Sequence, residues 1–237
     1  MSGRVGSITT DIVSDGLVFN MDAANRASYV GTGTISYNTI DTGVSGSFQD
    51  DAQFNETSGI KSFQFDGVDD YINCGTSIFT NYLSGATQFT FGYWCKKDTS
   101  GDDMMAGSWE HGGRDGMFLQ WYTNGTLYFG ISNGGSNNNS VSLSWADRYF
   151  YLVGEFDGSL ANNSRGKIYV DGVLTSFTAA TNLTSFTTDA SELQIGSLQN
   201  YSAWTDGNIG NVHLYNRALP ANEVLHNYNA LKGRFGL

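Results

Sequence analysis

Oxygen-bearing side chains suited to metal binding lie in two short stretches of the sequence. Asp66, Asp69 and Asp70 fall close together, and Asp206 and Asn208 stand near the other end of the chain. Calcium takes roughly six to eight oxygen ligands from carboxylates, amides and carbonyls, which makes these residues the candidate metal ligands. The alternative is that the aspartates only organise a turn, because their side chains bond nearby backbone N–H groups. The small number of oxygen ligands that can be named favours the turn.

A second group of side chains suited to binding lies in glycine-rich loops. Its aromatic, charged and histidine members are Trp109, Glu110, His111, Arg114, Tyr201 and Trp204. Binding pockets combine aromatic platforms with a few polar groups, so these residues are the candidate sugar-binding set. Aromatic side chains are equally ordinary at protein interfaces, so packing on the end of the domain or on a neighbouring subunit is the alternative.

The composition indicates strands and tight turns that could hold such loops. The length of 237 residues fits one β-sandwich, and 40% hydrophobic residues permit a sizeable core. Charged residues make up only 15%, below the roughly 25% of ordinary soluble domains. Gly, Ser, Thr and Asn take their place.

The charge balance and the apolar runs exclude several classes of partner. Twelve Lys and Arg against 23 Asp and Glu leave a net charge of −11, whereas nucleic-acid binding requires cations that neutralise phosphates. No stretch approaches the roughly 18 apolar residues of a membrane helix, and the first residues lack the apolar core of a signal peptide. We therefore expect no nucleic-acid binding, no membrane insertion and no export signal. Cys74 and Cys95 are expected as buried thiols, with a disulfide as the alternative.

Alternating apolar residues predict antiparallel strands. In one run Phe89, Phe91, Tyr93 and Cys95 fall on the same face. Asn-Gly at 124–125 and Asp-Gly at 171–172 favour tight hairpin turns between apolar runs. Further strand signals lie at residues 17–19, 61–65, 149–156, 193–196 and 209–215. The polar stretch 132–140 is predicted as a solvated turn.

One helix is predicted near the C-terminus. Pro220 fits the first helical position, N1. Val224, Leu225, Tyr228 and Leu231 follow helical spacing, and Gly233 is expected to end the helix. Many strands with one short terminal helix predict an all-β, two-sheet antiparallel sandwich at residues 16–237, preceded by an N-terminal arm at residues 1–15.

Three segments resemble the laminin-G-like domains of the concanavalin A-like lectin/glucanase superfamily. Residues 65–72 read Phe-Asp-Gly-Val-Asp-Asp-Tyr-Ile, residues 15–25 match the Gly-Leu-Val-x-x-x-Asp-Ala start of such domains, and residues 207–219 match their last strand. The resemblance implies a concanavalin A-like jelly roll. It also implies calcium at the sheet rim, which would bring Asp66, Asp69 and Asp70 together with Asp206 or Asn208.

The resemblance extends to glycoside hydrolases, which need two carboxylates at a controlled separation. Their strand motif is Glu-x-Asp-x-x-Glu, and Glu155 with Asp157 comes nearest to it, but Leu160 stands in the place of the third acid. No Gly-x-Ser-x-Gly elbow accompanies any of the three histidines. We expect that the chain is not an enzyme.

The closing residues 227–236 are similar to modules of tailed phages that occur as virion structural proteins. This resemblance implies a capsid decoration or tail-associated subunit, assembled in the host cytoplasm, whose arm and loop aromatics contact capsid or tail proteins. The alternative is a carbohydrate-binding module that recognises a host-surface glycan, with calcium organising its site. Uncovered strand edges pair with other chains, so a homo-oligomer belongs to the expected assemblies.

Overall fold

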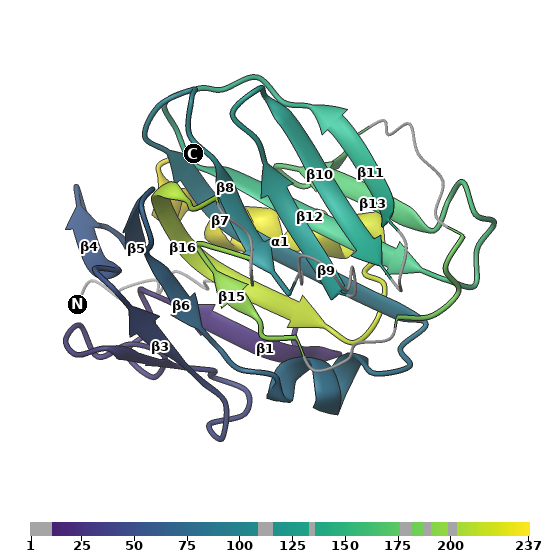
Figure 1. Ribbon diagram of the computed structural model, residues 1–237, viewed down its shortest axis with the longest axis horizontal. Coiled ribbons are helices and arrows are strands. Elements are labelled where there is room, and N and C mark those ends of the chain that lie inside the picture. Colours follow the sequence, from purple (N-terminus) through teal and green to yellow (C-terminus); the bar gives the residue numbers. More distant parts are fainter. Residues whose placement is uncertain (1–10, 109–115, 133–135, 176–181, 187–190, 199–202) are drawn as a thin grey trace, which may run out of the picture.

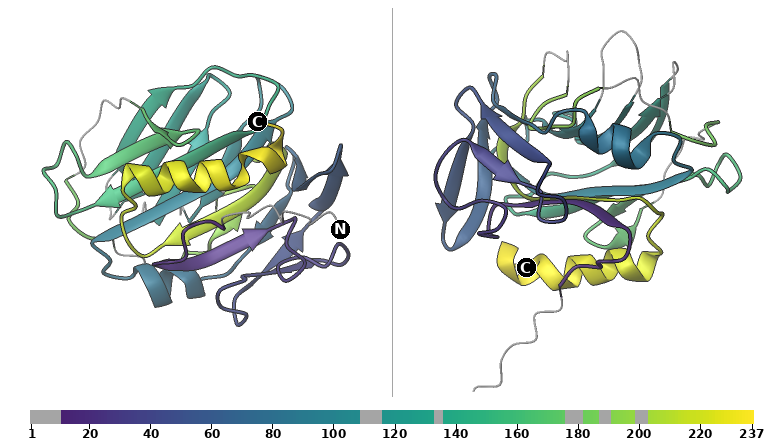
Figure 2. Two further views of the ribbon diagram at one scale, coloured as in Figure 1. Left: turned by 180° about the vertical axis from the view of Figure 1, so that it is seen from behind. Right: turned by 90° about the horizontal axis from the view of Figure 1, so that it is seen from below.

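The computed structural model describes residues 11–108, 116–132, 136–175, 182–186, 191–198 and 203–237. Two eight-stranded antiparallel sheets pack face to face, and the helix α1 (Ala221–Leu231) lies outside them (Figures 1 and 2). The predicted all-β, two-sheet sandwich with one C-terminal helix is confirmed. Among the described residues, no helix is both long and apolar enough to cross a bilayer.

Sheet A has the strand order β14-β13-β12-β7-β16-β5-β4, and β1 pairs with β16 as well. Its strands are β1 (Leu17–Asp22), β4 (Gln53–Thr57), β5 (Ile60–Asp66), β7 (Gln88–Lys97), β12 (Phe150–Asp157), β13 (Gly166–Val170), β14 (Val173–Leu174) and β16 (Asp206–Tyr215). The register of β16 shifts between Ile209 and Asn211. Its first part pairs with β5, and the part after the shift pairs with β1.

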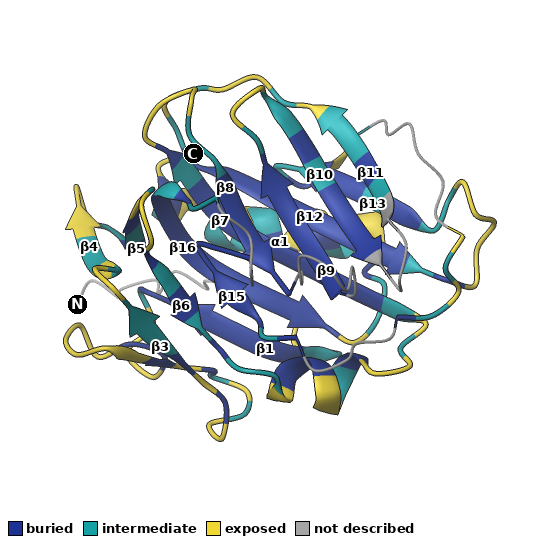
Figure 3. Cartoon of the chain, in the orientation of Figure 1, coloured by how far each residue is buried: buried dark blue, intermediate teal, exposed yellow. Residues whose placement is uncertain are grey.

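Sheet B has the strand order β11-β10-β9-β8-β15-β6-β3-β2. Its strands are β2 (Ile35–Tyr37), β3 (Ser45–Gln49), β6 (Tyr71–Asn73), β8 (Met104–Gly107), β9 (Gly116–Trp121), β10 (Thr126–Ser132), β11 (Ser136–Ser142) and β15 (Gln194–Ile195). The short helical segments η1 (Phe79–Leu83) and η2 (Lys232–Phe235) complete the elements. Both sheets are buried along their centres and exposed at their ends (Figure 3).

The core lies between the sheets and follows the predicted alternation. Phe89, Phe91, Tyr93 and Cys95 of β7 are fully buried in it. Cys74 is buried as well, and both cysteines are free thiols whose pKa is raised by burial. The prediction of two core thiols is therefore confirmed.

Both predicted hairpins form, but the polar stretch after β10 is not a solvated turn. Asp171 and Gly172 adopt φ angles of 52° and 79°, as a tight hairpin turn requires. Most of the stretch 132–140 belongs to strand β11, which pairs along β10. Its Asn139 is buried, with its amide occupying the place of a side chain at Gly166. The prediction of a turn was wrong because backbone pairing, rather than apolar alternation, forms this strand.

Helix α1 covers the outer face of sheet A, as Figure 2 shows from behind. The ring of Trp94 on β7 stacks on Phe235 at a centroid distance of 4.4 Å and on Tyr228 at 5.6 Å. Pro220 is the N-cap residue rather than N1, and Gly233 does not end the helical segment. The helical segment continues through η2 and ends at Gly236, which has a φ of 78°. The stacking of Phe235 on Trp94 stabilises this extension.

The described part of the predicted arm is docked on the domain. The backbone N–H of Val13 donates to Oδ1 of Asn227 in α1 at 2.8 Å, and its carbonyl accepts from the Tyr215 hydroxyl at 2.8 Å. Asp15 pairs with Arg217 at 3.1 Å. Residues 11–15 therefore pack against α1 and β16, and residues 1–10 lie outside the described part of the chain.

Candidate ligand-binding face

The outer face of sheet B, which faces the viewer in Figure 1, carries a row of polar side chains. Ile72 points into the core, so its neighbours Tyr71 and Asn73 point outward from β6. Across the ladder Asn73 lies opposite Ser47 of β3 and Gln194 of β15. Three adjacent strands thus present amides, a hydroxyl and a phenol on one surface.

Hydrogen bonds hold this row in place. Nδ2 of Asn73 donates to Oε2 of Glu192 at 2.8 Å, and Nε2 of Gln194 donates to the same oxygen at 3.3 Å. Nε2 of Gln49 donates to Oγ of Ser47 at 2.7 Å. Side chains fixed in this way lose little conformational freedom when a ligand binds. The arrangement suits recognition of a hydroxyl-rich surface.

The other half of this face is apolar and covered. Met105, Phe118 and Leu198 are buried in one cluster, with Tyr128 and Ala203 packed against it. Leu198 follows Ser197 and Ala203 precedes Trp204, and Ser197 and Trp204 form an antiparallel bridge. On β3 and β6 the polar side chains of Ser47, Gln49, Tyr71 and Asn73 are partly exposed, whereas Gln194 of β15 is buried beside them.

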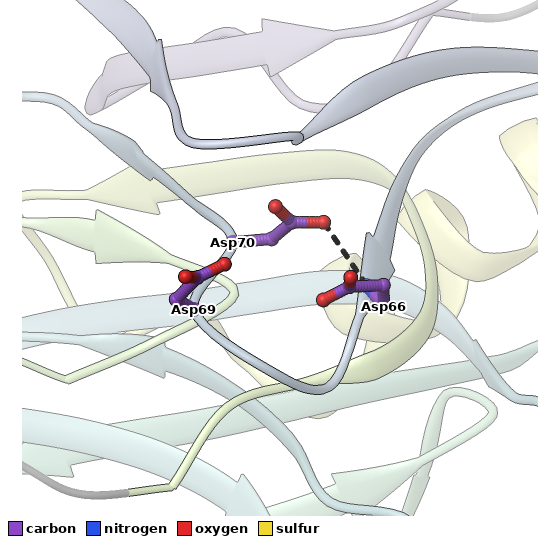
Figure 4. A group of neighbouring side chains, drawn as sticks. All are labelled: Asp66, Asp69 and Asp70. Atoms are coloured by element: carbon purple, nitrogen blue, oxygen red, sulfur yellow. Dashed lines mark hydrogen bonds between the residues drawn. The ribbon is translucent and has the colours of Figure 1, made fainter.

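The three predicted carboxylates meet in the turn between β5 and β6, at the start of β6 and beside this row (Figure 4). Carboxylate oxygens of Asp66, Asp69 and Asp70 all lie within 4.8 Å of one another. Oδ1 of Asp66 accepts from the N–H of Val68 at 2.9 Å, as an aspartate in a turn does. Asp70 accepts from the N–H of Asp51 at 2.8 Å and of Asp66 at 3.1 Å. The turn-forming role of Asp66 and Asp70 is thus present in the structure.

Like charges accumulate around this turn. Desolvation and then the charge of Asp50 raise the pKa of Asp69. Desolvation, followed by Asp102 and Asp98, raises the pKa of Asp206 to about 6. A bound cation would relieve this repulsion.

The two predicted metal ligands on β16, Asp206 and Asn208, differ in their position relative to the three aspartates. The side chain of Asp206 is near Gly67 in the turn of the trio, since a Cβ at Gly67 would lie 2.9 Å from that of Asp206. The side chain of Asn208 forms hydrogen bonds elsewhere on sheet A. Its Oδ1 accepts from Ser62 at 3.0 Å and from Asn55 at 3.1 Å. The structure therefore brings Asp206 toward the trio and holds the amide of Asn208 in another network.

Most of the predicted sugar-binding set lies outside the described residues. This applies to Trp109, Glu110, His111, Arg114 and Tyr201. Trp204 is described, is partly exposed and pairs with Ser197 beside the apolar cluster.

Glu155 and the two described histidines have local partners. Glu155 is buried on β12, where Lys167 pairs with its carboxylate and the Tyr169 hydroxyl donates to it at 2.6 Å. His213 is buried in a hydrogen-bonded network, and Nε2 of His226 bonds the carbonyl of Asp11 at 3.0 Å. These contacts position neighbouring elements.

Sequence reasoning missed the polar row on β3, β6 and β15. Its signal was the polar–apolar–polar pattern of Tyr71, Ile72 and Asn73, directly after the aspartates. The strand is three residues long, too short for alternation to stand out. Its pairing with β3 and β15 is a tertiary property.

The two packed antiparallel sheets and the outer polar face define a jelly-roll sandwich of the lectin-like class. The chain belongs to the concanavalin A-like lectin/glucanases superfamily, because a laminin G family model of that superfamily matches residues 66–225. The resemblance inferred from residues 65–72 and 207–219 is confirmed. Among curated protein sequences, none matches the chain significantly.

Solved structures share this fold at low sequence identity. Trypanosoma rangeli sialidase in complex with the inhibitor DANA matches with a TM-score of 0.63 and 16% identity, over 92% of this chain and 33% of the sialidase. The binding domain of botulinum neurotoxin DC in complex with rat synaptotagmin II matches with a TM-score of 0.65 and 11% identity, over 91% and 52%. The chain thus spans a third to a half of these proteins. They include an enzyme and a binding domain, so they support the fold and leave the activity to be argued from the site.

Proposed function

We propose that the chain is a non-catalytic binding module that recognises a carbohydrate on the outer face of sheet B. The observation that carries the proposal is the outward-facing row of Gln49, Tyr71 and Asn73 on β3 and β6, beside the buried amide of Gln194 on β15. Sugars offer many hydroxyls and apolar C–H faces, for which amides and an aromatic ring are suitable partners. The non-catalytic part is supported by Glu155, whose carboxylate pairs with Lys167 and Tyr169 rather than with a second acid.

In this proposal calcium binds at the acidic end of β6. The carboxylates of Asp66, Asp69 and Asp70 have the donor chemistry of a calcium site, and an oxygen that accepts a backbone hydrogen bond keeps a further lone pair. Titrating calcium into chain stripped with EDTA should give a binding isotherm and a rise in Tm. Asp69→Asn should remove both effects. No heat and no Tm change at millimolar calcium would reject the metal while leaving the sugar face untouched.

The virion setting, with capsid or tail proteins as partners, remains a proposal that rests on the resemblance of residues 227–236 to phage modules. Cryo-EM or immunogold labelling of particles from the source virus tests it directly. Regular copies on the capsid indicate a decoration protein, and copies at the tail indicate a receptor-binding role. Particles without this sandwich would reject the virion setting and leave a stand-alone binding module.

A glycan array with the intact chain tests the sugar face. Tyr71→Ala and Gln49→Ala should each weaken binding by about tenfold or more, as central contacts do. Gln53→Ala and Thr57→Ala on β4 are the controls, because both are exposed residues of sheet A and lie away from this row. Equal losses in the controls, or no glycan bound by the intact chain, would contradict the proposal.

A further inference from the structure

A cleft of about 790 Å³ opens on the opposite side of the molecule from the polar row. It lies on the outer face of sheet A, where residues of β1 and of the end of α1 line it. Asp11, Ile12 and Ser14 of the arm and Gly59 are among the residues that line it. Its volume falls in the range of about 300–1,000 Å³ that small-molecule sites occupy.

The charge of this cleft differs from that of the whole chain. Three basic side chains line it, namely Arg26, Lys61 and Arg234, against two acidic ones, Asp11 and Asp22. The whole chain has 12 basic and 23 acidic residues. The cleft therefore has an excess of positive charge on a strongly acidic protein, which favours an anionic ligand.

One acid and one base of the cleft, Asp22 and Arg234, neutralise each other, which leaves Arg26 and Lys61 against Asp11. Asp22 receives both terminal nitrogens of Arg234, at 2.7 and 2.8 Å. This fork leaves further N–H groups of the guanidinium for another acceptor. Lys61 has only a loose pair with Glu56 at 3.9 Å, and such exposed pairs hold a charge weakly. Arg26 is exposed, and none of the described residues forms an ion pair with it.

The floor of the cleft is rigid. Asn20 and Asn211 line it and are buried. Nδ2 of Asn211 donates to Oδ1 of Asn20 at 2.8 Å, and Nδ2 of Asn20 donates to Thr39 at 2.9 Å. A floor fixed by buried hydrogen bonds positions a site without loss of side-chain freedom on binding.

We propose that this cleft binds an acidic saccharide, whose carboxylate or sulfate groups pair with Arg26, Lys61 and Arg234. The amide floor and the hydroxyl of Ser14 suit the neutral hydroxyls of such a ligand, and Leu17 and Leu231 offer it apolar surface. This second site is separate from the polar row of sheet B and depends on different residues.

Calorimetry on the intact chain tests the assignment. The probes are tetragalacturonate and a chondroitin sulfate tetrasaccharide, each beside its neutral counterpart with esterified, reduced or desulfated acid groups. We expect the acidic forms to bind and the neutral forms not to bind. Arg26→Gln and Lys61→Gln should each weaken binding about tenfold, as loss of a charged hydrogen bond does. Added salt should weaken it further.

Lys96→Gln is the matched control, because Lys96 is a lysine of sheet A that lies outside this cleft and pairs with Asp147. It should leave binding unchanged. Failure of both acidic probes to bind better than their neutral forms would overturn the proposal. Stronger binding of tetraglutamate than of either saccharide would assign the cleft to acidic peptides instead. Binding that survives Arg26→Gln and Lys61→Gln but is lost in Tyr71→Ala would place the ligand on sheet B and overturn the cleft site alone.

Discussion

At the scale of single residues, a buried polar chain runs beneath helix α1 on the outer face of sheet A. Nδ2 of Asn211 donates to Asn20, so the other amide atom of Asn211, Oδ1, is an acceptor. Nδ1 of His213 therefore donates to Oδ1 of Asn211 at 3.0 Å. Nε2 of His213 then accepts from the Tyr151 hydroxyl at 2.8 Å. This pattern is satisfied by the neutral imidazole, with one ring nitrogen donating and the other accepting.

Stability should fall with acidity because of His213. Burial lowers its pKa from 6.5 to about 3. Between these values the unfolded chain binds a proton that the folded chain does not, so the free energy of unfolding decreases as pH falls, by up to about 1.4 kcal/mol per pH unit. His213→Gln should flatten this part of the profile in urea titrations at pH 7, 5 and 4. His226→Gln, on the exposed surface of α1, should keep the profile of the parent chain; equal slopes in all three proteins would contradict the assignment.

Asp206 should affect the pH dependence of stability in the opposite direction, so that its contribution favours the folded chain at low pH. Its pKa is raised from 3.8 to about 6, chiefly by desolvation and then by Asp102 and Asp98. The folded chain holds this proton more tightly than the unfolded chain, so its contribution to stability is lost as pH rises through about 6. Asp206→Asn should raise Tm at pH 8 by about 2 °C and give no gain at pH 4. Glu56→Gln, at an exposed carboxylate, should show no such pH dependence in the same melting series.

At the scale of elements, the two sheets come into close contact where a glycine faces an aromatic ring. Gly154 in β12 lies against the ring of Phe129 from β10, and a Cβ there would overlap that ring. Gly154→Ala should therefore lower the free energy of unfolding by about 1–3 kcal/mol, as overpacking does. Gly233→Ala is the control, since a Cβ there meets open space, and it should change stability by less than about 0.5 kcal/mol. Urea denaturation measures both, and equal effects would show that the sheets can separate to admit the methyl group.

The strands could be predicted from sequence where alternating residue types distinguish the two faces of the strand. β7 shows it best, since Phe89, Phe91 and Tyr93 alternate and all point into the core. Strand β11 was not predicted, because Asn137 to Asn139 show no alternation and their pairing with β10 depends on a partner strand. The end of α1 was also misplaced, because Phe235 stacks on Trp94 and extends the helical segment past Gly233.

At the scale of the whole molecule, residues 11–15 near the start of the chain are joined by hydrogen bonds to helix α1 near its end. A chain that begins at Asp11 should be more stable than one that begins at Gly16, by about 1–3 kcal/mol, because the shorter chain leaves the buried Asn227 without its partner Val13. Thermal melts of the two truncations measure this difference. Equal stability would mean that the docked segment contributes nothing to the fold.

The docking of residues 11–15 on the domain changes how truncation can be used to separate the proposed functions. If the chain is a virion protein, removal of residues 1–15 should abolish assembly, and if it is a carbohydrate-binding module, the same deletion should spare sugar binding. Because residues 11–15 pack on α1, that deletion also perturbs the cleft lined by Asp11, Ile12 and Ser14. A deletion that stops before Asp11 is the sharper test of arm contacts with capsid or tail proteins.

The sequence by itself determined the sandwich class, the two tight hairpins, the C-terminal helix and the aspartate turn at residues 66–70. Each of these depends on local periodicity or on the conformational preference of one or two residues, which a sequence shows directly. Only the tertiary structure decided the polar row on sheet B and the basic cleft on sheet A. The row requires the pairing of β3, β6 and β15, and the cleft gathers Arg26, Lys61 and Arg234. Residues so far apart in the chain meet because of the order in which strands pair and the face on which α1 packs, and no local pattern encodes either.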